Sequence, residues 1–200
     1  MVVGEFRYAT LRQPGSGPAC RWLPRGTETR RRADEIKTTS MDELRGTAGR
    51  FAEELRQRGV PSQVIEMPES TRSAAEAAAA IGCDIAQIVK SLVFRAVERD
   101  EPVLVLASGA DRVDETRLSG LAGPIERAPA NFVRARTGFA IGGVPPFGHV
   151  EALETYLDQH LLDHEVVWAA AGTPRAVFAI GPRELVQIAS ARVVSVATAG

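Results

Sequence analysis

The apolar run PVLVLAS at positions 102–108 is the feature of this sequence that most restricts its fold. It does not alternate between apolar and polar residues, as a strand with one solvent-exposed face would. The run therefore predicts a central strand of a sheet, with other elements covering both of its faces. A chain of 200 residues that are 44% hydrophobic is long enough to bury such a sheet in one globular domain.

Helices and further strands are expected before and after this strand. Segment 73–82 places Glu76 three residues after Ser73 and ends at Gly82, which is the pattern of a capped helix. Strands and helices follow one another without a regular β-α-β alternation, so we expect an α+β fold with a mixed sheet. The other predicted elements are a helix at 41–58, a strand at 62–67, a short helix turning into a strand within 84–97, helices within 111–123 and 128–138, strands at 166–172 and 176–181, a helix at 182–189 and a strand at 191–196.

Residues 1–40 differ in composition from the rest of the chain. They are rich in Arg, Gly, Pro and Thr and show no apolar periodicity. Such a segment cannot bury enough apolar surface to order itself, so we expect a disordered extension followed by one domain over 41–200. An RNA-contacting arm and a true start at Met41 are the alternatives. Ser40 is the expected N-cap of the first helix, Glu43 completes its capping box and Gly59 ends it.

Composition excludes several classes of function. A formal net charge of -1 argues against a protein that coats long duplexes, although a local basic patch suffices to grip the end of an RNA. Cys20 and Cys83 have no metal-ligand spacing and form no disulfide framework, which is typical of a reduced cytoplasmic protein. The sequence contains neither an apolar run long enough for a membrane span nor a signal-peptide core, so no membrane association is expected. Because phosphate-loop and dinucleotide-binding motifs are also absent from the sequence, we expect no cofactor.

Two histidines and one lysine are the isolated candidates for chemistry. His160, Asp163 and His164 in HLLDH approximate a metalloprotease motif, but Asp replaces Glu and no third ligand is evident. A solvated helix face is the preferred interpretation, and no metal is expected. Lys90 lies between apolar residues in QIVKSLVF, where a lysine either extends its ammonium to solvent or reaches a specific partner.

The segment TGFAIGGVPPFGH at 137–149 is the strongest local signal. Gly142 and Gly143 can present backbone N–H groups without side chains in the way, and Pro145 and Pro146 hold the loop extended. Donors held in this way bind a carbonyl or stabilise an oxyanion. A tight turn between two strands is the alternative, and the residues alone leave both interpretations open.

Five segments together resemble a known family. IAQIVKSLVF, PVLVLASGADRVD, TGFAIGGVPPFGH, VVWAAAGTPRAVFAI and PRELVQI occur in the order found in the YbaK/EbsC family. That family is similar to the editing domain inserted in bacterial prolyl-tRNA synthetases, and the resemblance spans about Met41 to Ala197. It implies a curved, barrel-like mixed sheet surrounded by helices. It also implies hydrolysis of the ester that joins a wrong amino acid to tRNA.

The resemblance also implies site residues and partners. Lys90 matches the family's lysine, and Gly142 to Pro146 match its G-x-x-x-P loop, so the implied catalytic residues are Lys90, Gly142 and Gly143. The implied partners are the 3′ aminoacyl end of mischarged tRNA, often tRNA-Pro, and prolyl-tRNA synthetase, with the protein a monomer or weak dimer. The implied substrate-binding residues are Ser91, Val144, Pro145, Pro146, Phe147, Gly148, Ala170, Gly172 and Thr173.

One departure from the family concerns the amino acid. Deacylases of cysteinyl-tRNA-Pro that resemble this chain carry a serine in the strand at Ala169 to Ala171, whereas WAAAG has no hydroxyl. The alanines are therefore expected to shape a pocket for another small side chain. Two other functions stay open: a non-catalytic tRNA- or partner-binding regulator with the same fold, and a hydrolase of a different small ester or amide. Lys90 and the intact glycine loop favour the deacylase.

Overall fold

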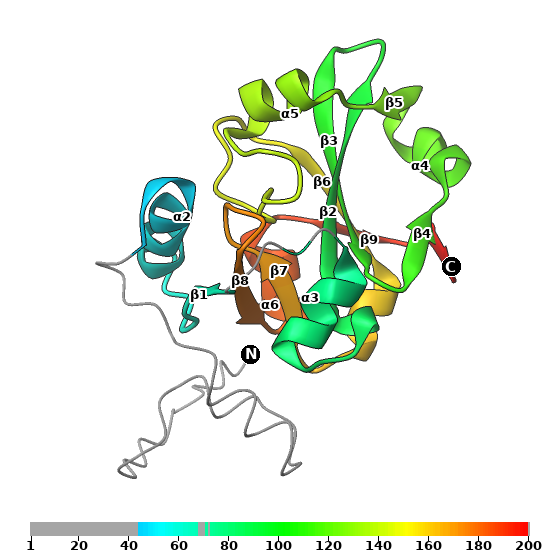
Figure 1. The fold of residues 1–200 in the computed structure, drawn as a ribbon. Helices are drawn as coiled ribbons and strands as arrows, with labels where there is room; N and C mark the ends of the chain where they lie inside the picture. The colour runs from blue at the N-terminus through cyan, green and yellow to red at the C-terminus, as the bar shows by residue number, and fades with distance from the viewer. Residues whose placement is uncertain (1–43, 68–70, 72, 200) are drawn as a thin grey trace, which may run out of the picture.

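A five-stranded mixed sheet forms the centre of the protein (Figure 1). The structure is a computed structural model that describes residues 44–67, 71 and 73–199. The longest strands, β2 and β3, run antiparallel in the middle of the sheet, and β6 and β9 continue it in parallel. Across the sheet, the strands are β5 (Ile125–Arg127), β2 (Val89–Ala96), β3 (Glu101–Ser108), β6 (Glu154–Asp158) and β9 (Arg192–Val194).

Two smaller sheets flank the central one. A three-stranded sheet has the order β1 (Ile65–Glu66), β8 (Ala176–Ile180) and β7 (Val167–Ala170), and β4 (Asp111–Val113) pairs with β10 (Ala197–Ala199). A single parallel bridge between Ile88 and Trp168 links the three-stranded sheet to the beginning of β2. The α+β class with a mixed sheet is confirmed, but the described strands form three separate sheets and do not close into a barrel.

Helices cover both faces of the central sheet, as the apolar run at 102–108 requires. Leu104 and Leu106 of β3 join the core that contains α2 and the β7–β8 hairpin, whereas Val103 and Val105 join the core beneath α4. Both faces of β3 are therefore buried, which confirms its central position. The helices are α2 (Gly46–Gln57), α3 (Ala74–Ile81), α4 (Glu115–Ala122), α5 (Ala130–Thr137) and α6 (Pro182–Ile188), with short 3-10 helices η2 (Ile85–Gln87) and η3 (Gln159–Asp163).

Local signals in the sequence place several of these helices correctly. The Ser73 hydroxyl accepts the N–H of Glu76 at the start of α3, and Gly82 ends that helix in the left-handed conformation. The first described helix differs from expectation, since it begins at Gly46 after Arg45 in an extended conformation. The predicted capping box of Ser40 and Glu43 lies outside the described residues, as do the extension at 1–40 and Met41.

The segment around HLLDH is also different from the expected helix face. The buried strand β6 precedes HLLDH directly, and most of HLLDH itself forms the 3-10 helix η3, which carries His160. The short strands β4, β5 and β10 were not predicted either. None of the helices in the part of the chain that the structure describes is long and apolar enough to cross a membrane.

Candidate active site

Two adjoining cavities lie along the first half of β2. The Arg112 cavity, about 460 Å³, extends toward β4 and β5, and the Ala170 cavity, about 330 Å³, extends toward α3 and the β7–β8 hairpin. Both volumes fall in the range that is typical of ligand sites. The two cavities share lining residues from β2 and from the loop before β6, and these are Lys90, Ser91, Leu92, Ile141, Gly142 and Val144.

An open edge of β2 borders the two cavities. Strand β5 pairs with β2 only from Phe94 onward, and the bridge to β7 lies at Ile88, so residues 90–92 have no strand partner on that side among the described residues. The Ile88 carbonyl accepts the Gly109 N–H on the β3 side, and the Val93 carbonyl accepts the Ala128 N–H on the opposite side. Because peptide groups alternate in direction along an antiparallel strand, the peptide N–H and C=O of Ser91 point toward the open edge.

The ammonium of Lys90 is held by backbone carbonyls beside the cavities. Its Nζ donates to the Gly109 carbonyl, in the turn between β3 and β4, at 3.3 Å and to the Asp111 carbonyl at the start of β4. Burial lowers the pKa of Lys90, the nearby Asp111 carboxylate acts in the opposite direction, and Arg112 lowers it further. The lysine predicted from QIVKSLVF therefore reaches a specific partner rather than solvent alone.

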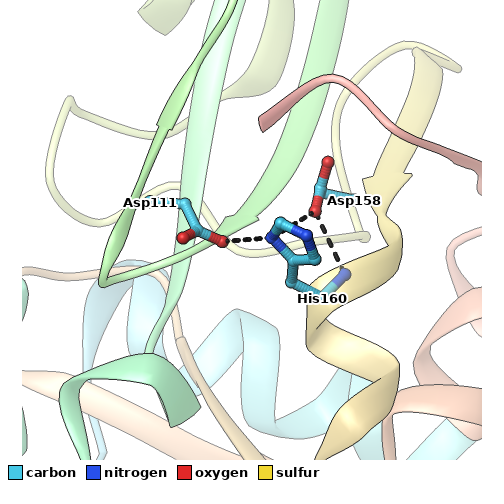
Figure 2. A group of neighbouring side chains, drawn as sticks. All are labelled: Asp111, Asp158 and His160. Carbon is cyan, nitrogen blue, oxygen red and sulfur yellow. Dashed lines mark hydrogen bonds and ion pairs between the residues drawn. The ribbon is translucent and has the colours of Figure 1, made fainter. Parts of the chain in front are cut away.

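Asp111, whose carbonyl accepts the Lys90 ammonium, also forms a network with His160 and Asp158 (Figure 2). The Asp111 carboxylate is hydrogen-bonded to Nδ1 of His160 at 2.8 Å, and this bond raises the pKa of His160. The fully buried Asp158 carboxylate accepts the backbone N–H groups of His160, Val196 and Ala197. Through these bonds the network connects η3 to β4 and to the chain entering β10.

This network changes the interpretation of His160. The histidine was expected on a solvated helix face, but it bridges the carboxylate of Asp158, two residues earlier, and that of Asp111, from a distant part of the sequence. A histidine with two aspartates has the composition of a metal site. The oxygens of Asp158 are already bonded to N–H groups, and Nδ1 of His160 is bonded to Asp111, so hydrogen bonding within the protein accounts for the cluster.

The two glycines of the loop have different surroundings. Gly142 has a φ of +85°, lines both cavities, and its N–H has no hydrogen-bond partner among the described residues. The N–H of Gly143 is donated to the Ala140 carbonyl at 3.0 Å, so it is not available as the expected donor to a substrate. A Cβ on Gly143 would lie 2.7 Å from Cα of Thr173, which shows that this glycine allows two backbones to pack closely.

The residues that follow Val144 support the loop from the core. Pro145, Pro146 and Phe147 are buried, and the Phe147 ring lies 5.0 Å from the ring of Phe51 in α2. Nε2 of His149 lies 2.8 Å from the Pro145 carbonyl, and burial lowers the pKa of this histidine. Four of the expected substrate-binding residues line neither cavity, because they pack inward, and these are Pro145, Pro146, Phe147 and Gly148.

The hairpin between β7 and β8 provides the wall made of small residues. Ala170 and Thr173 line the Ala170 cavity, together with Ala169 and Trp168, which sequence reasoning did not assign to the site. Gly172 lines neither cavity, and its carbonyl accepts the Thr47 hydroxyl of α2 at 2.7 Å. Six expected site residues therefore meet in the two cavities, namely Lys90, Ser91, Gly142, Val144, Ala170 and Thr173.

Sequence reasoning also did not assign Ile141 and Arg112 to the site. Ile141 is 57% exposed although it is a large apolar residue, and it lines both cavities. Its position directly before Gly142 is the sequence signal that could have assigned Ile141 to the site. Arg112 lies in β4, and only its pairing with β10 and the turn after β3 bring it beside Lys90.

Comparison with known proteins defines first the class of domain and then its family. A solved structure of a candidate trans-editing enzyme for prolyl tRNA synthetase is 47% identical, with a TM-score of 0.71 over 78% of this chain and 99% of that chain. The family model of the aminoacyl-tRNA editing domain matches residues 68–188, and the chain belongs to this family. The resemblance found in the sequence is thereby confirmed.

Two relatives show how this domain occurs in other proteins. The protein YwhH of Bacillus subtilis is 33% identical over 133 residues, which cover 66% of this chain and 84% of YwhH. The proline–tRNA ligase of Limosilactobacillus fermentum is 34% identical over 111 residues, which cover 50% of this chain and 19% of the ligase. The domain thus resembles both most of a small protein and one part of a much larger synthetase.

Proposed function

We propose that this protein is a trans-editing hydrolase that removes a wrong small amino acid from mischarged tRNA, with tRNA-Pro as the tRNA. The observation that carries the proposal is the meeting of Lys90, Ser91 and Gly142 where two cavities adjoin. Membership of the aminoacyl-tRNA editing family supports the reaction class, and similarity to part of a proline–tRNA ligase supports the choice of tRNA.

The chemistry required is modest because an aminoacyl ester is already activated. Water adds to the carbonyl carbon of the ester, and the bond to the ribose oxygen then breaks. The amino acid leaves as a carboxylate, one proton of the water passes to the ribose oxygen, and the other passes to solvent. Such a reaction is accelerated mainly by orientation and by stabilising the charge that develops on the carbonyl oxygen.

In this proposal the site residues have separate roles. The N–H of Gly142, which has no partner among the described residues, donates to the carbonyl oxygen as it becomes negative, and the ammonium of Lys90 holds the phosphate or ribose end of the tRNA. The open-edge peptide of Ser91 borders the same cavities and orients the aminoacyl group.

The Ala170 cavity accounts for the proposed preference for small amino acids. Ala169, Ala170 and Thr173 line it with short side chains, and no cysteine-directing hydroxyl is present at Ala169 to Ala171. A hydrophobic wall of this kind discriminates by size and only modestly against a side chain that differs by one methylene. We therefore place alanine or serine ahead of cysteine as the edited amino acid.

The proposal also includes the location of the protein in the cell, its partner and its oligomeric state. A protein that acts on charged tRNA works where tRNA is charged, so we place it in the cytoplasm and expect contact with prolyl-tRNA synthetase. We expect a monomer or weak dimer, which sedimentation equilibrium at several concentrations would measure.

A deacylation panel tests the proposal directly. Wild-type protein is mixed with tRNA-Pro and with other tRNAs carrying Ala, Ser, Thr, Cys or Pro, and release of the amino acid is followed. We expect hydrolysis of at least one mischarged tRNA-Pro and a loss on the order of a hundredfold or more for Lys90→Ala, as for other single electrostatic contacts at reacting centres. Arg183→Ala is the control, because Arg183 is exposed on α6 and lines neither cavity.

The alternatives predict different outcomes in the same panel. Binding of charged tRNA without turnover of any member would support the non-catalytic regulator. Full activity of a correctly folded Lys90→Ala protein would remove Lys90 from the site, and hydrolysis of simple esters without any charged tRNA would support a different hydrolase.

A further inference from the structure

Asp111 acts on Lys90 through two different groups. Its backbone carbonyl accepts a hydrogen bond from the Lys90 ammonium, as does the carbonyl of Gly109. Burial lowers the pKa of Lys90, and the nearby Asp111 carboxylate raises it. The backbone of Asp111 therefore holds the ammonium in place, whereas its carboxylate could pair with the ammonium and cancel its charge. The direction in which that carboxylate points decides how much positive charge Lys90 offers to a ligand.

The Asp111 carboxylate points toward His160 and is hydrogen-bonded to it (Figure 2). Its Oδ2 lies 2.8 Å from Nδ1 of His160, which is its one side-chain partner within the described residues. In the same part of the chain, the Lys90 ammonium is bonded to two backbone carbonyls and to no carboxylate. The charge of Lys90 is therefore not cancelled by a direct ion pair.

Asp158 fixes both the histidine and the strand that carries Asp111. Its Oδ1 accepts the backbone N–H of His160 at 3.1 Å, and its Oδ2 accepts those of Val196 and Ala197 at 2.9 and 2.7 Å. Ala197 begins β10, and the pairing of β10 with β4 includes Asp111. One fully buried carboxylate therefore connects the two residues that must meet, since it binds the backbone on both sides.

Loss of the His160 ring would leave the Asp111 carboxylate without its partner. Asp111 is 8% exposed, and an unpaired charge with so little access to water is costly. Lys90 is a cation on which this carboxylate already acts, and its ammonium is bonded to the backbone of the same residue. We therefore expect the freed carboxylate to turn toward Lys90.

We infer that His160 is a positioning residue, which holds the Asp111 carboxylate away from Lys90 and so keeps the ammonium free to bind the substrate. His160 lines neither cavity, so it acts through Asp111 and does not touch the substrate. The consequence for the reaction rests on the proposed function, because that proposal gives Lys90 its role. The arrangement of the three side chains can be tested without any reaction.

A spectroscopic experiment measures the ionisation of Lys90 directly. Lys37 and Lys90 are the only lysines in the sequence, so in the full chain isotope-labelled at lysine Cε, Lys37→Arg identifies the magnetic resonance signal of Lys90. We expect the pKa of Lys90 to be higher in His160→Ala than in the wild type, because the freed carboxylate stabilises the ammonium. His160→Asn should keep the wild-type pKa of Lys90, since its amide nitrogen is attached to Cγ as Nδ1 is and can donate to Asp111.

A second background separates this effect from a loosened turn, which would also raise the pKa of Lys90 by exposing the ammonium to water. Asp111→Asn keeps the carbonyl and removes the charge, so the pKa of Lys90 should fall below that of the wild type. Adding His160→Ala to Asp111→Asn should then change nothing, because a double-mutant cycle isolates the effect that needs both residues. A rise in both backgrounds, or no rise in His160→Ala alone, overturns the inference.

Deacylation of mischarged tRNA tests the consequence for the reaction. We expect His160→Ala to lose about tenfold in rate per folded molecule, as for the loss of one charge-assisted hydrogen bond, and His160→Asn to recover most of that loss. His164→Ala is the matched control with the wild-type rate, because this histidine directly follows η3 and lines neither cavity. Thermal melts give the folded fraction of each variant. A loss in His160→Asn as large as that in His160→Ala contradicts positioning through Asp111.

The two measurements distinguish failure of this inference from failure of the proposed function. If the wild type hydrolyses no charged tRNA but the pKa of Lys90 changes as expected across the four proteins of the cycle, His160 positions Asp111 and the proposed function is wrong. If the wild type hydrolyses mischarged tRNA but the pKa of Lys90 does not change in this way, the proposed function is supported and the positioning role of His160 is wrong.

Discussion

Replacing Gly143 by alanine should destabilise the protein because two backbones meet at this position. A Cβ there would lie 2.7 Å from Cα, 2.8 Å from C and 2.9 Å from N of Thr173. All three atoms belong to the backbone of the β7–β8 hairpin, so no side chain can rotate away. Overpacking of this kind costs about 1–3 kcal/mol. A domain of this size loses roughly 2–4 °C in melting temperature for each kcal/mol.

Gly142→Val tests the other glycine of the loop, where we expect the effect on the reaction to exceed the effect on stability. A Cβ on Gly142 would make an ordinary contact of 3.6 Å with Pro174, but φ of +85° adds about 1–2 kcal/mol of backbone strain for any L-residue. The added methyl groups would occupy the junction of the two cavities. We expect its deacylation rate per folded molecule to fall well beyond what the stability loss explains.

Thermal melts and single-turnover deacylation rates of the folded fraction distinguish the two effects. Gly120→Ala is the control, since this glycine lies within α4 with nothing within 4 Å of its Cβ position, and alanine favours a helix. If Gly143→Ala melts at the wild-type temperature, the close packing against Thr173 is refuted. If Gly142→Val keeps the full rate, the loop serves only as a turn.

Two further predictions concern single side chains near the site. The raised pKa of His160 means that its ion pair with Asp111 contributes fully below about pH 6.5, its ordinary pKa, and is lost as pH rises through the raised value. The melting temperature of wild type minus that of His160→Gln should therefore decrease as pH rises above 6.5. His149 is present in both proteins and cancels, and a constant difference would contradict the ion pair. Oγ of Ser91 is the one buried side-chain polar atom without a hydrogen-bond partner among the described residues, so Ser91→Ala should raise stability by about 1 kcal/mol. Lower stability of Ser91→Ala would mean that the hydroxyl has a partner in the folded protein.

Much of the fold was predictable because its signals are local. The caps of α3, the helix stop at Gly138 and Pro182 at the first position of α6 depend on a few neighbouring residues. The apolar run of β3 predicted a central strand because its pattern records burial on both faces. Strands β5, β6 and β10 are short, and their pairing partners lie far away in the sequence, so no local pattern marked them.

The candidate site was likewise predictable from the sequence only in part. The unusual setting of Lys90 and the glycines of the loop indicated functional positions, since residue type alone limits what a buried lysine or a side-chain-free backbone can do. Sequence could not show that the Gly143 N–H is taken by Ala140, because that bond depends on how the loop turns.

The sequence by itself determined the capped helices, the buried central strand and the residue types available for chemistry, because each follows from the conformational preferences and hydrophobicity of neighbouring residues. Only the tertiary structure decided that His160 meets Asp111 from 49 positions away, and that Arg112 and Lys90 face one cavity while Ala170 faces another. Those contacts depend on the pairing of distant strands, and the free energy of that pairing is a property of the whole packed domain.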